Sequence, residues 1–190
     1  MLIFMKTEDR RVRKTKRALQ EGLAELLLET NLRKITVREL TDKVDIHRAT
    51  FYAHYKDIYD LYEQIENTVF DELSKIIVRD PSHKYDDIFK VIIDYIHSNS
   101  KICRMFISKN GNHSFYNRIS TFLEEQYFDI WKYETNQIAV TEELQFLIKY
   151  HIQGCLAIVS RWAESNYSYP KDKLADIILN VDINFDKILY

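Results

Sequence analysis

The sequence has 190 residues, of which 46% are hydrophobic and 29% are charged, a composition typical of a soluble globular protein with one sizeable core or two small ones. It contains only three glycines and two prolines, and a β-rich protein needs more of both for its turns, so composition favours an all-α fold. Cys103 and Cys155 show neither a disulfide framework nor zinc spacing, which indicates a reduced, cytoplasmic protein. The apolar start MLIFM is too short for a signal peptide or a membrane span, and no other apolar run approaches the roughly 18 residues that a span needs.

The charge is unevenly distributed along the chain. The net charge is −2, but residues 1–56 carry 13 Lys and Arg against 8 Asp and Glu, whereas the remainder carries 14 against 21. A basic head on an acidic body indicates that only the head meets a polyanion, although ordinary solvated charge would give the same pattern.

The first predicted helix covers residues 10–30. Val12, Leu19, Leu23 and Leu26 fall at helical spacing, Thr7 is a candidate N-cap, and Asn31 is a candidate stop. Its first turns are strongly basic, with Arg10, Arg11, Arg13, Lys14, Lys16 and Arg17.

Two short helices and one long helix follow. Residues 36–39 (Thr-Val-Arg-Glu) form a capping box that predicts a helix of about two turns. Asp45 suits a turn, because Asp tolerates left-handed backbone, and a third helix is expected from about His47 to Tyr55. Asp57 is the expected cap of the fourth helix, with an apolar stripe made by Ile58, Leu61, Tyr62, Ile65, Val69 and Leu73.

The helical pattern breaks around residues 79–87, where Pro81 stops a helix. We therefore expect an N-terminal head over residues 1–56 and a body over residues 57–190, joined by the helix at 57–79. The body is predicted to hold five further helices, at about 84–98, 100–108, 113–132, 141–165 and 170–188, with Ser100 and Thr141 as candidate caps and Pro170 at a first helical position.

The third helix has two distinct faces. Phe51 and Tyr55 are an i,i+4 pair suited to packing inward, while Ala49 and Ala53 form an i,i+4 pair on the opposite face. An outward face of alanine lets the backbone approach another molecule closely. A short helix, a turn and a second helix with such a face match a helix-turn-helix, whose second helix enters the major groove of DNA.

Residues 10–73 resemble the DNA-binding head of the TetR/AcrR family of transcriptional regulators. The resemblance is carried by ITVRELTDKVDIHRATFYAHYKDIYDLYE, above all the Thr-aromatic-Tyr-x-His-aromatic run at 50–55. It implies a ligand-responsive repressor that binds a palindromic operator as a homodimer. In that family the positions matching Thr36, Arg48, Ala49, Thr50, Tyr52 and His54 commonly contact DNA, and we add Arg38, His47 and Lys56 as candidates.

Three positions depart from the family pattern. Val44-Asp45 replaces the usual Ala-Gly of the turn, His47 replaces Ser, and Ile58 replaces a phosphate-binding lysine for which Lys56 can substitute. Val44-Asp45 and Ile58 are the only support for an alternative function, a helical coregulator that does not bind an operator.

The end of the body, HIQGCLAIVSRWAESNYSYPKDKLADII, resembles the end of a TetR-type regulatory domain, whose last two helices pair with their twins in a dimeric four-helix bundle. Gly154 and Ala157 allow close helix approach, and Ile158 and Trp162 supply apolar area, so these four are candidate interface residues. The alternative is that they pack within one subunit.

The body also has enough aromatic residues for an effector cavity. The candidate lining residues are Phe89, Ile93, Met105, Phe106, Phe122 and Tyr150, although aromatic residues at helical spacing are more often plain core. The effector is a small molecule of unknown identity.

We expect no metal site, cofactor or catalytic constellation. His151 and Cys155 are i,i+4, but a core or interface pair is favoured because no carboxylate or third histidine joins them. The adjacent glutamates at 124–125 and 142–143 point about 100° apart on a helix and do not converge, and there is no P-loop or glycine-rich dinucleotide turn.

Overall fold

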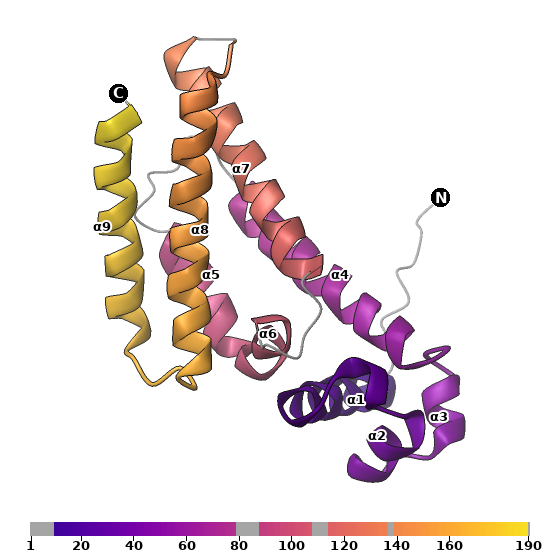
Figure 1. The fold of residues 1–190 in the computed structure, drawn as a ribbon. Coiled ribbons are helices and arrows are strands. Elements are labelled where there is room, and N and C mark those ends of the chain that lie inside the picture. The colour runs from indigo at the N-terminus through magenta and orange to yellow at the C-terminus, as the bar shows by residue number, and fades with distance from the viewer. Residues whose placement is uncertain (1–9, 79–87, 108–113, 137–138, 190) are drawn as a thin grey trace, which may run out of the picture.

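The structure, a computed structural model, describes residues 10–78, 88–107, 114–136 and 139–189. Within these ranges the chain forms nine α-helices and no strand, which confirms the all-α fold (Figure 1). The elements are α1 (Arg10–Glu29), a 3-10 turn η1 (Leu32–Lys34), α2 (Val37–Lys43), α3 (Arg48–Tyr52), α4 (Ile58–Ile77), α5 (Ile88–Ser98), α6 (Ser100–Ile107), α7 (Ser114–Thr135), α8 (Glu142–Glu164) and α9 (Lys171–Leu189).

The head is built by α1, α2 and α3. Thr36 caps α2, with its hydroxyl oxygen accepting from the Glu39 amide at 3.1 Å, as the capping box predicts. Asp45 has φ 54°, which confirms the left-handed turn expected there. Two details differ from expectation: α3 ends at Tyr52, and Asn31 caps the unexpected turn η1 rather than only ending α1.

Helix α4 joins the head to the body. Asp57 caps it, accepting from the Asp60 amide at 2.8 Å, and its buried face consists of the six residues expected from the sequence. The helix runs from beside α3 up along α7 (Figure 1). Its buried side chains belong to one continuous core that extends from Leu23 of α1 to Trp162 of α8. Head and body therefore share a core, so a shift of α4 would change the packing in both.

The body consists of α5 to α9, with α8 and α9 lying side by side as long antiparallel helices (Figure 1). A second, smaller core lies between α7, α8 and α9, made by Trp131, Leu144, Ile148, Ile152 and Phe185. The predicted helix bounds agree to within a few residues. Pro170 precedes α9, where its carbonyl accepts from the Leu174 amide at 3.0 Å. The expected cap Thr7, the stop Pro81 and residues 84–87 lie outside the described residues.

No helix in the described parts of the chain has both the length and the apolarity needed to cross a membrane.

Candidate nucleic-acid interface and body cavity

Helix α3 is held by one face and presents the other. Phe51 is fully buried and Tyr55 is 3% exposed, and their ring centroids lie 5.6 Å apart. Ala49 and Ala53 are exposed on the outward side. The outer face of this helix therefore carries only methyl groups at its centre, which leaves room for a groove wall and for contact with a thymine methyl group.

The side chains around this face are hydrogen-bonding groups. Arg48 is exposed, and Tyr52 is 58% exposed with its ring edge-on to Phe51 at 5.5 Å between centroids. The buried ring thus limits where the Tyr52 hydroxyl can point. Thr50 and His54 are half-buried beside it. Short or rigid side chains of this kind suit phosphate contacts that set the register of a helix on DNA.

Helix α2 and the start of α4 add polar groups near α3. The exposed Thr36 hydroxyl accepts from the Glu39 amide and keeps its own proton for donation. Arg38 is paired with Asp42 at 3.5 Å, an exposed ion pair that a phosphate can replace. The Lys56 side chain is exposed, while its backbone amide donates to Asp60 at 2.7 Å and holds the pKa of that carboxyl below its usual value.

His47 and Ile58 are two of the family departures. His47 stands at the N-cap of α3, but its side chain makes no capping hydrogen bond and is exposed. Ile58 is 4% exposed and packs in the core, so this position offers nothing to DNA. The burial of Ile58 was expected from the apolar stripe of its helix, whereas the missing capping bond of His47 is known only from the structure.

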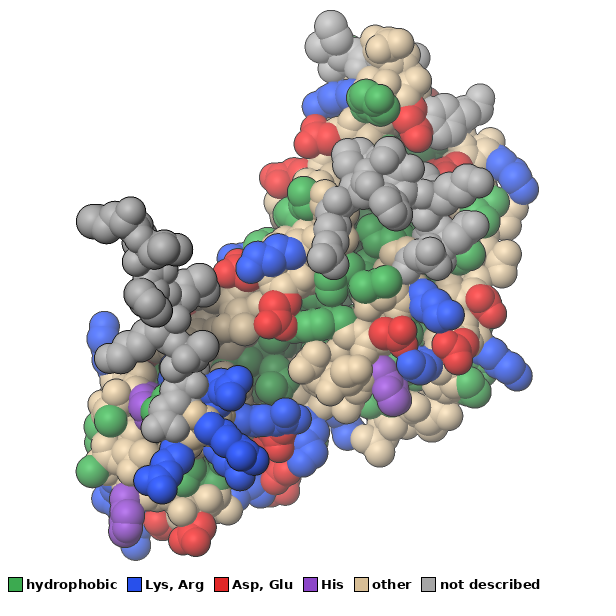
Figure 2. Space-filling view, turned by 180° about the vertical axis from the view of Figure 1, so that it is seen from behind, with side chains coloured by type: hydrophobic (Ala, Val, Ile, Leu, Met, Phe, Trp, Pro, Cys, Tyr) green, Lys and Arg blue, Asp and Glu red, His purple; other side chains and the backbone are tan. Residues whose placement is uncertain are grey.

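The charge of the head is arranged to suit a polyanion. Lys and Arg side chains gather over the head in Figure 2, whereas both signs are interspersed over the body. In α1, the exposed cations are Arg10, Arg11, Arg13, Lys14 and Arg17, of which Arg17 pairs with Glu21 at 2.8 Å. A basic surface attracts polyanions, and binding of that kind depends steeply on salt.

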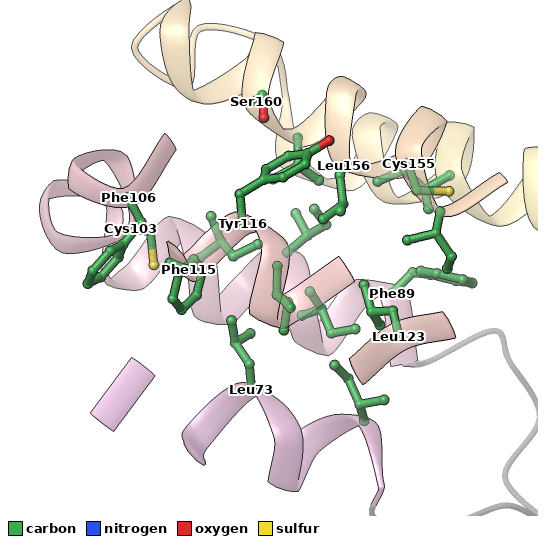
Figure 3. Close-up of a pocket in the computed structure, with 18 of the residues that line it drawn as sticks. Leu73, Phe89, Cys103, Phe106, Phe115, Tyr116, Leu123, Cys155, Leu156 and Ser160 are labelled. Carbon is green, nitrogen blue, oxygen red and sulfur yellow. The ribbon is translucent and has the colours of Figure 1, made fainter. Parts of the chain in front are cut away.

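The body contains a partly open cavity of about 150 Å³ lined by residues of α4 to α9. Leu73, Phe89, Phe115, Leu123 and Leu156 point into it from four different helices (Figure 3). Figure 2 shows hydrophobic side chains in a hollow near the middle of the face of the molecule that is in view. The lining is almost entirely apolar, so the cavity suits an apolar ligand.

The predicted pocket residues divide into two groups. Phe89, Ile93 and Phe106 line the cavity. Met105 is fully buried away from it, and Phe122 packs on Phe70 with centroids 5.5 Å apart. Tyr150 is 79% exposed on the outer side of α8, so its assignment to the pocket is wrong.

Three polar side chains meet at one part of the cavity wall. Tyr127 of α7 and His151 of α8 both contact Asp182 Oδ1 of α9, with His151 Nε2 at 2.9 Å. Burial, reinforced by the Asp182 charge, raises the pKa of the Tyr127 hydroxyl far above its usual value. The same two causes raise the pKa of the Cys155 thiol to about 12. Cys155 Sγ lies 3.8 Å from His151 Nε2.

This cluster corrects the sequence analysis, which expected no carboxylate beside His151 and Cys155. Asp182 was missed because it lies 31 residues further along the chain. A signal was present: Asp182 stands in the apolar stripe of α9, one turn after Ile178 and about one turn before Phe185. A single acidic residue in a buried stripe indicates a polar partner on another helix, because a buried carboxylate needs a hydrogen-bond donor.

The candidate interface residues also divide. Trp162 is 2% exposed and donates its Nε1 proton to the Tyr169 carbonyl at 2.8 Å, and Ile158 packs against the core of its own chain. Trp162 therefore lies inside the protomer and its assignment to an interface is wrong, whereas Ile158 is only partly buried. Gly154 and Ala157 are exposed on the same outer stripe of α8 as Phe146 and Tyr150.

Comparisons with known proteins agree with this architecture. The family model described as "Transcriptional regulator C-terminal region", of the TetR type, matches residues 83–182. No curated protein matches the chain significantly.

Three solved structures show the same fold. The fatty acid degradation regulator FadR from Bacillus halodurans has a TM-score of 0.64 at 10% identity, covering 95% of this chain and 96% of its own. A TetR-family transcriptional regulator from Streptomyces coelicolor has a TM-score of 0.61 at 12% identity, covering 91% and 79%. The dihydroxyacetone kinase operon activator DhaS has a TM-score of 0.56 at 15% identity, covering 92% and 97%.

The family match spans more than half of the chain and covers the body, while the head shows the helix-turn-helix that the N-terminal motif predicts. This chain belongs to the TetR family of transcriptional regulators.

Proposed function

We propose that the protein binds a palindromic operator as a homodimer, with one α3 helix from each protomer in successive major grooves. The observation that carries this proposal is the outward face of α3, where exposed Ala49 and Ala53 are rimmed by Arg48, Thr50 and Tyr52. Such a face lets the helix backbone approach base edges while its rim holds phosphates. Half-sites about one helical turn apart, roughly 34–36 Å, are what a two-fold dimer of this type contacts.

The departures from the family pattern do not favour the coregulator alternative. Asp45 adopts the left-handed conformation for which the family uses glycine, with φ 54°. Val44 packs against Gly22, which has no side chain to obstruct it. Ile58 is buried, and the exposed Lys56 lies two residues before it, just ahead of the N-cap of the same helix.

The dimer would form through the outer faces of α8 and α9. Phe146 and Tyr150 are 69% and 79% exposed, and with Gly154 and Ala157 they follow one stripe of α8. On α9, Ile177, Val181 and Ile188 are 41%, 42% and 66% exposed along a similar stripe. Two neighbouring helices with contiguous exposed apolar stripes match the bundle of four helices that joins protomers in the family.

An effector in the body cavity would control the spacing of the heads. The cavity wall includes Val69 and Leu73 of α4, the helix that enters the head. Helix α6 also packs against α1, where Lys101 pairs with Glu25 at 3.1 Å. An effector whose affinity differs between two arrangements of these helices shifts the protein toward the arrangement it prefers.

The proposal is tested by selecting bound sequences from random duplex DNA and then measuring affinity for the enriched sequence. Tyr52→Ala and Arg48→Ala are each expected to weaken binding by about 1–3 kcal/mol. Tyr133→Ala and Lys90→Ala are matched controls, because both residues are exposed on the body, and they should bind like the wild type. Enrichment of no sequence would favour the coregulator, and undiminished binding by both head variants would exclude α3 as the contacting helix.

A further inference from the structure

The described wall of the body cavity is apolar except at the cluster of Tyr127, His151 and Asp182 and at the hydroxyl groups of Tyr116 and Ser160. Most of the side chains that line the cavity are aliphatic or phenyl groups from α4 to α9. The polar cluster belongs to the part of the wall where α7, α8 and α9 meet. A ligand in the cavity therefore meets hydrocarbon over most of its surface and one corner that carries a carboxylate.

That corner has an unused acceptor. Asp182 is fully buried, and its Oδ1 accepts from the Tyr127 hydroxyl and lies 2.9 Å from His151 Nε2. Its Oδ2 is equally buried and has no hydrogen-bond partner among the described residues. Buried carboxylate oxygens are normally satisfied, because desolvation without a donor is costly. Such an orphaned oxygen in a cavity wall indicates a donor that comes from outside the chain.

The electrostatics of the corner favour a positively charged donor. Among the described residues, the cavity lining includes Asp182 but no Lys or Arg, and His151 is its one basic side chain. A second acid, Asp186, lies one turn further along α9, and burial together with the Asp182 charge raises its pKa. A cation entering this corner meets a buried negative charge that the protein itself only partly compensates.

We infer that the cavity takes a small organic amine, whose apolar body fills the hydrocarbon part and whose ammonium group donates to Asp182 Oδ2. This inference deepens the proposed function and rests on the cavity being the effector site. A cavity of about 150 Å³ holds a molecule of roughly the size of benzene, so the ligand carries one ring or a short branched chain. Tyr127 and His151 act as positioning residues, because their contacts with Oδ1 hold the carboxylate and leave Oδ2 without a partner among the described residues.

The wild-type chain tests the inference without any substitution. Calorimetric titration at pH 7 uses four probes of similar shape: benzylamine, benzyl alcohol, toluene and benzoate. We expect benzylamine to bind at least about ten-fold more tightly than benzyl alcohol or toluene, since a charge-assisted hydrogen bond is stronger than a neutral one. Benzoate should bind most weakly, because its carboxylate meets that of Asp182.

A matched pair of variants then locates the charge. Asp182→Asn keeps the size of the side chain but removes its charge, and is expected to abolish the preference for benzylamine while toluene still binds. Asp176→Asn makes the same change on the exposed side of α9 and should behave like the wild type. Thermal melts of the unliganded variants verify that each is folded. If Asp182→Asn does not fold, the comparison of the four probes on the wild type still shows whether the cavity prefers an amine.

Each outcome separates this inference from the proposed function. Equal binding of benzylamine, benzyl alcohol and toluene overturns the assignment of an amine but keeps an apolar effector cavity. Binding of no probe overturns both the amine and the cavity as an effector site. DNA binding is measured on the ligand-free protein, so the test of the proposed operator binding does not depend on either result.

Discussion

Gly22 in α1 and Val44 at the end of α2 pack so closely that neither residue can grow. A Cβ atom on Gly22 would lie 2.3 Å from Val44 Cγ1 and 3.1 Å from Leu40 Cδ1. Because the family usually carries the smaller alanine at the position of Val44, Gly22 is the neighbour that accommodates the larger side chain. The contact sets how closely α1 approaches the helix-turn-helix.

Gly22→Ala is therefore expected to destabilise the protein. Overpacking of a tight contact costs about 1–3 kcal/mol, against which alanine in a helix recovers about 1 kcal/mol. Adding Val44→Ala removes the clash, so the double variant should lose less stability than the two single effects added together. Urea unfolding of the four proteins in the cycle measures this coupling, and strictly additive effects would show that the two residues do not constrain each other.

The proposed dimer predicts that charge on the outer stripe of α8 separates the protomers. Phe146→Glu and Tyr150→Glu are each expected to weaken dimerisation by about 100-fold, as loss of an aromatic anchor does at other interfaces. Operator affinity should fall with it, because one head contacts only one half-site. Sedimentation equilibrium gives the dissociation constant.

The control for this experiment is Tyr133→Glu. Tyr133 of α7 is 81% exposed, and it lies on neither of the two apolar stripes. Its charged variant should remain dimeric. Dimers of unchanged strength in all three variants would place the interface elsewhere.

Asp186 makes stability depend on pH. Burial, together with the charges of Asp182 and Glu134, raises its pKa from 3.8 to about 6, while His151 opposes the shift. Between pH 4 and 6 the folded state therefore binds more protons at this site than the unfolded state, so its contribution to stability falls as pH rises through that window. Asp186→Asn should gain about 1 kcal/mol over the wild type at pH 7, after allowance for its partial exposure.

The measurement is the difference in unfolding free energy between wild type and Asp186→Asn from pH 3.5 to 7.5. The difference should be near zero below pH 4 and reach a plateau above pH 6. Taking the difference removes the titration of carboxyls such as Glu25, whose pKa is lowered by Lys101 and Lys43. A difference that does not change with pH would show that Asp186 has an ordinary pKa.

A substitution at His47 can distinguish a role in capping α3 from a role in DNA contact. Its side chain makes no capping hydrogen bond to α3, so His47→Ser should supply one and raise stability by about 0.5–1 kcal/mol. If the exposed imidazole contacts DNA, as we expect, the same variant binds the operator about five-fold more weakly despite its higher stability. Unfolding and gel-shift measurements on one preparation give both quantities, and unchanged affinity would remove His47 from the interface.

Local chemistry was predictable from the sequence. The capping box at Thr36, the left-handed turn at Asp45, the cap at Asp57 and the inward pair Phe51 and Tyr55 all depend on residues within a few positions of one another. Helical periodicity located the remaining helices for the same reason, since one buried stripe is a property of a single segment.

The surroundings of residues in the body were harder to predict. Helical spacing shows which residues share a face of a helix, but not which other helix that face packs against. Tyr150 and Trp162 both lie on α8 and both are aromatic, yet the first is 79% exposed and the second 2%. Which face of α8 turns toward α7 and α9 depends on packing between segments far apart in the chain. Predictions from sequence spacing alone therefore assigned Tyr150 to the pocket and Trp162 to the interface, whereas the structure exposes the first and buries the second.

The sequence by itself determined the helices, their caps and the motif of the DNA-binding head, because these follow from short-range hydrogen bonding and periodicity. Only the tertiary structure brought Asp182 to His151 and Tyr127 across 31 and 55 residues of chain, and Val44 against Gly22. Such meetings depend on how helices dock, and docking is decided by the whole core rather than by any one segment.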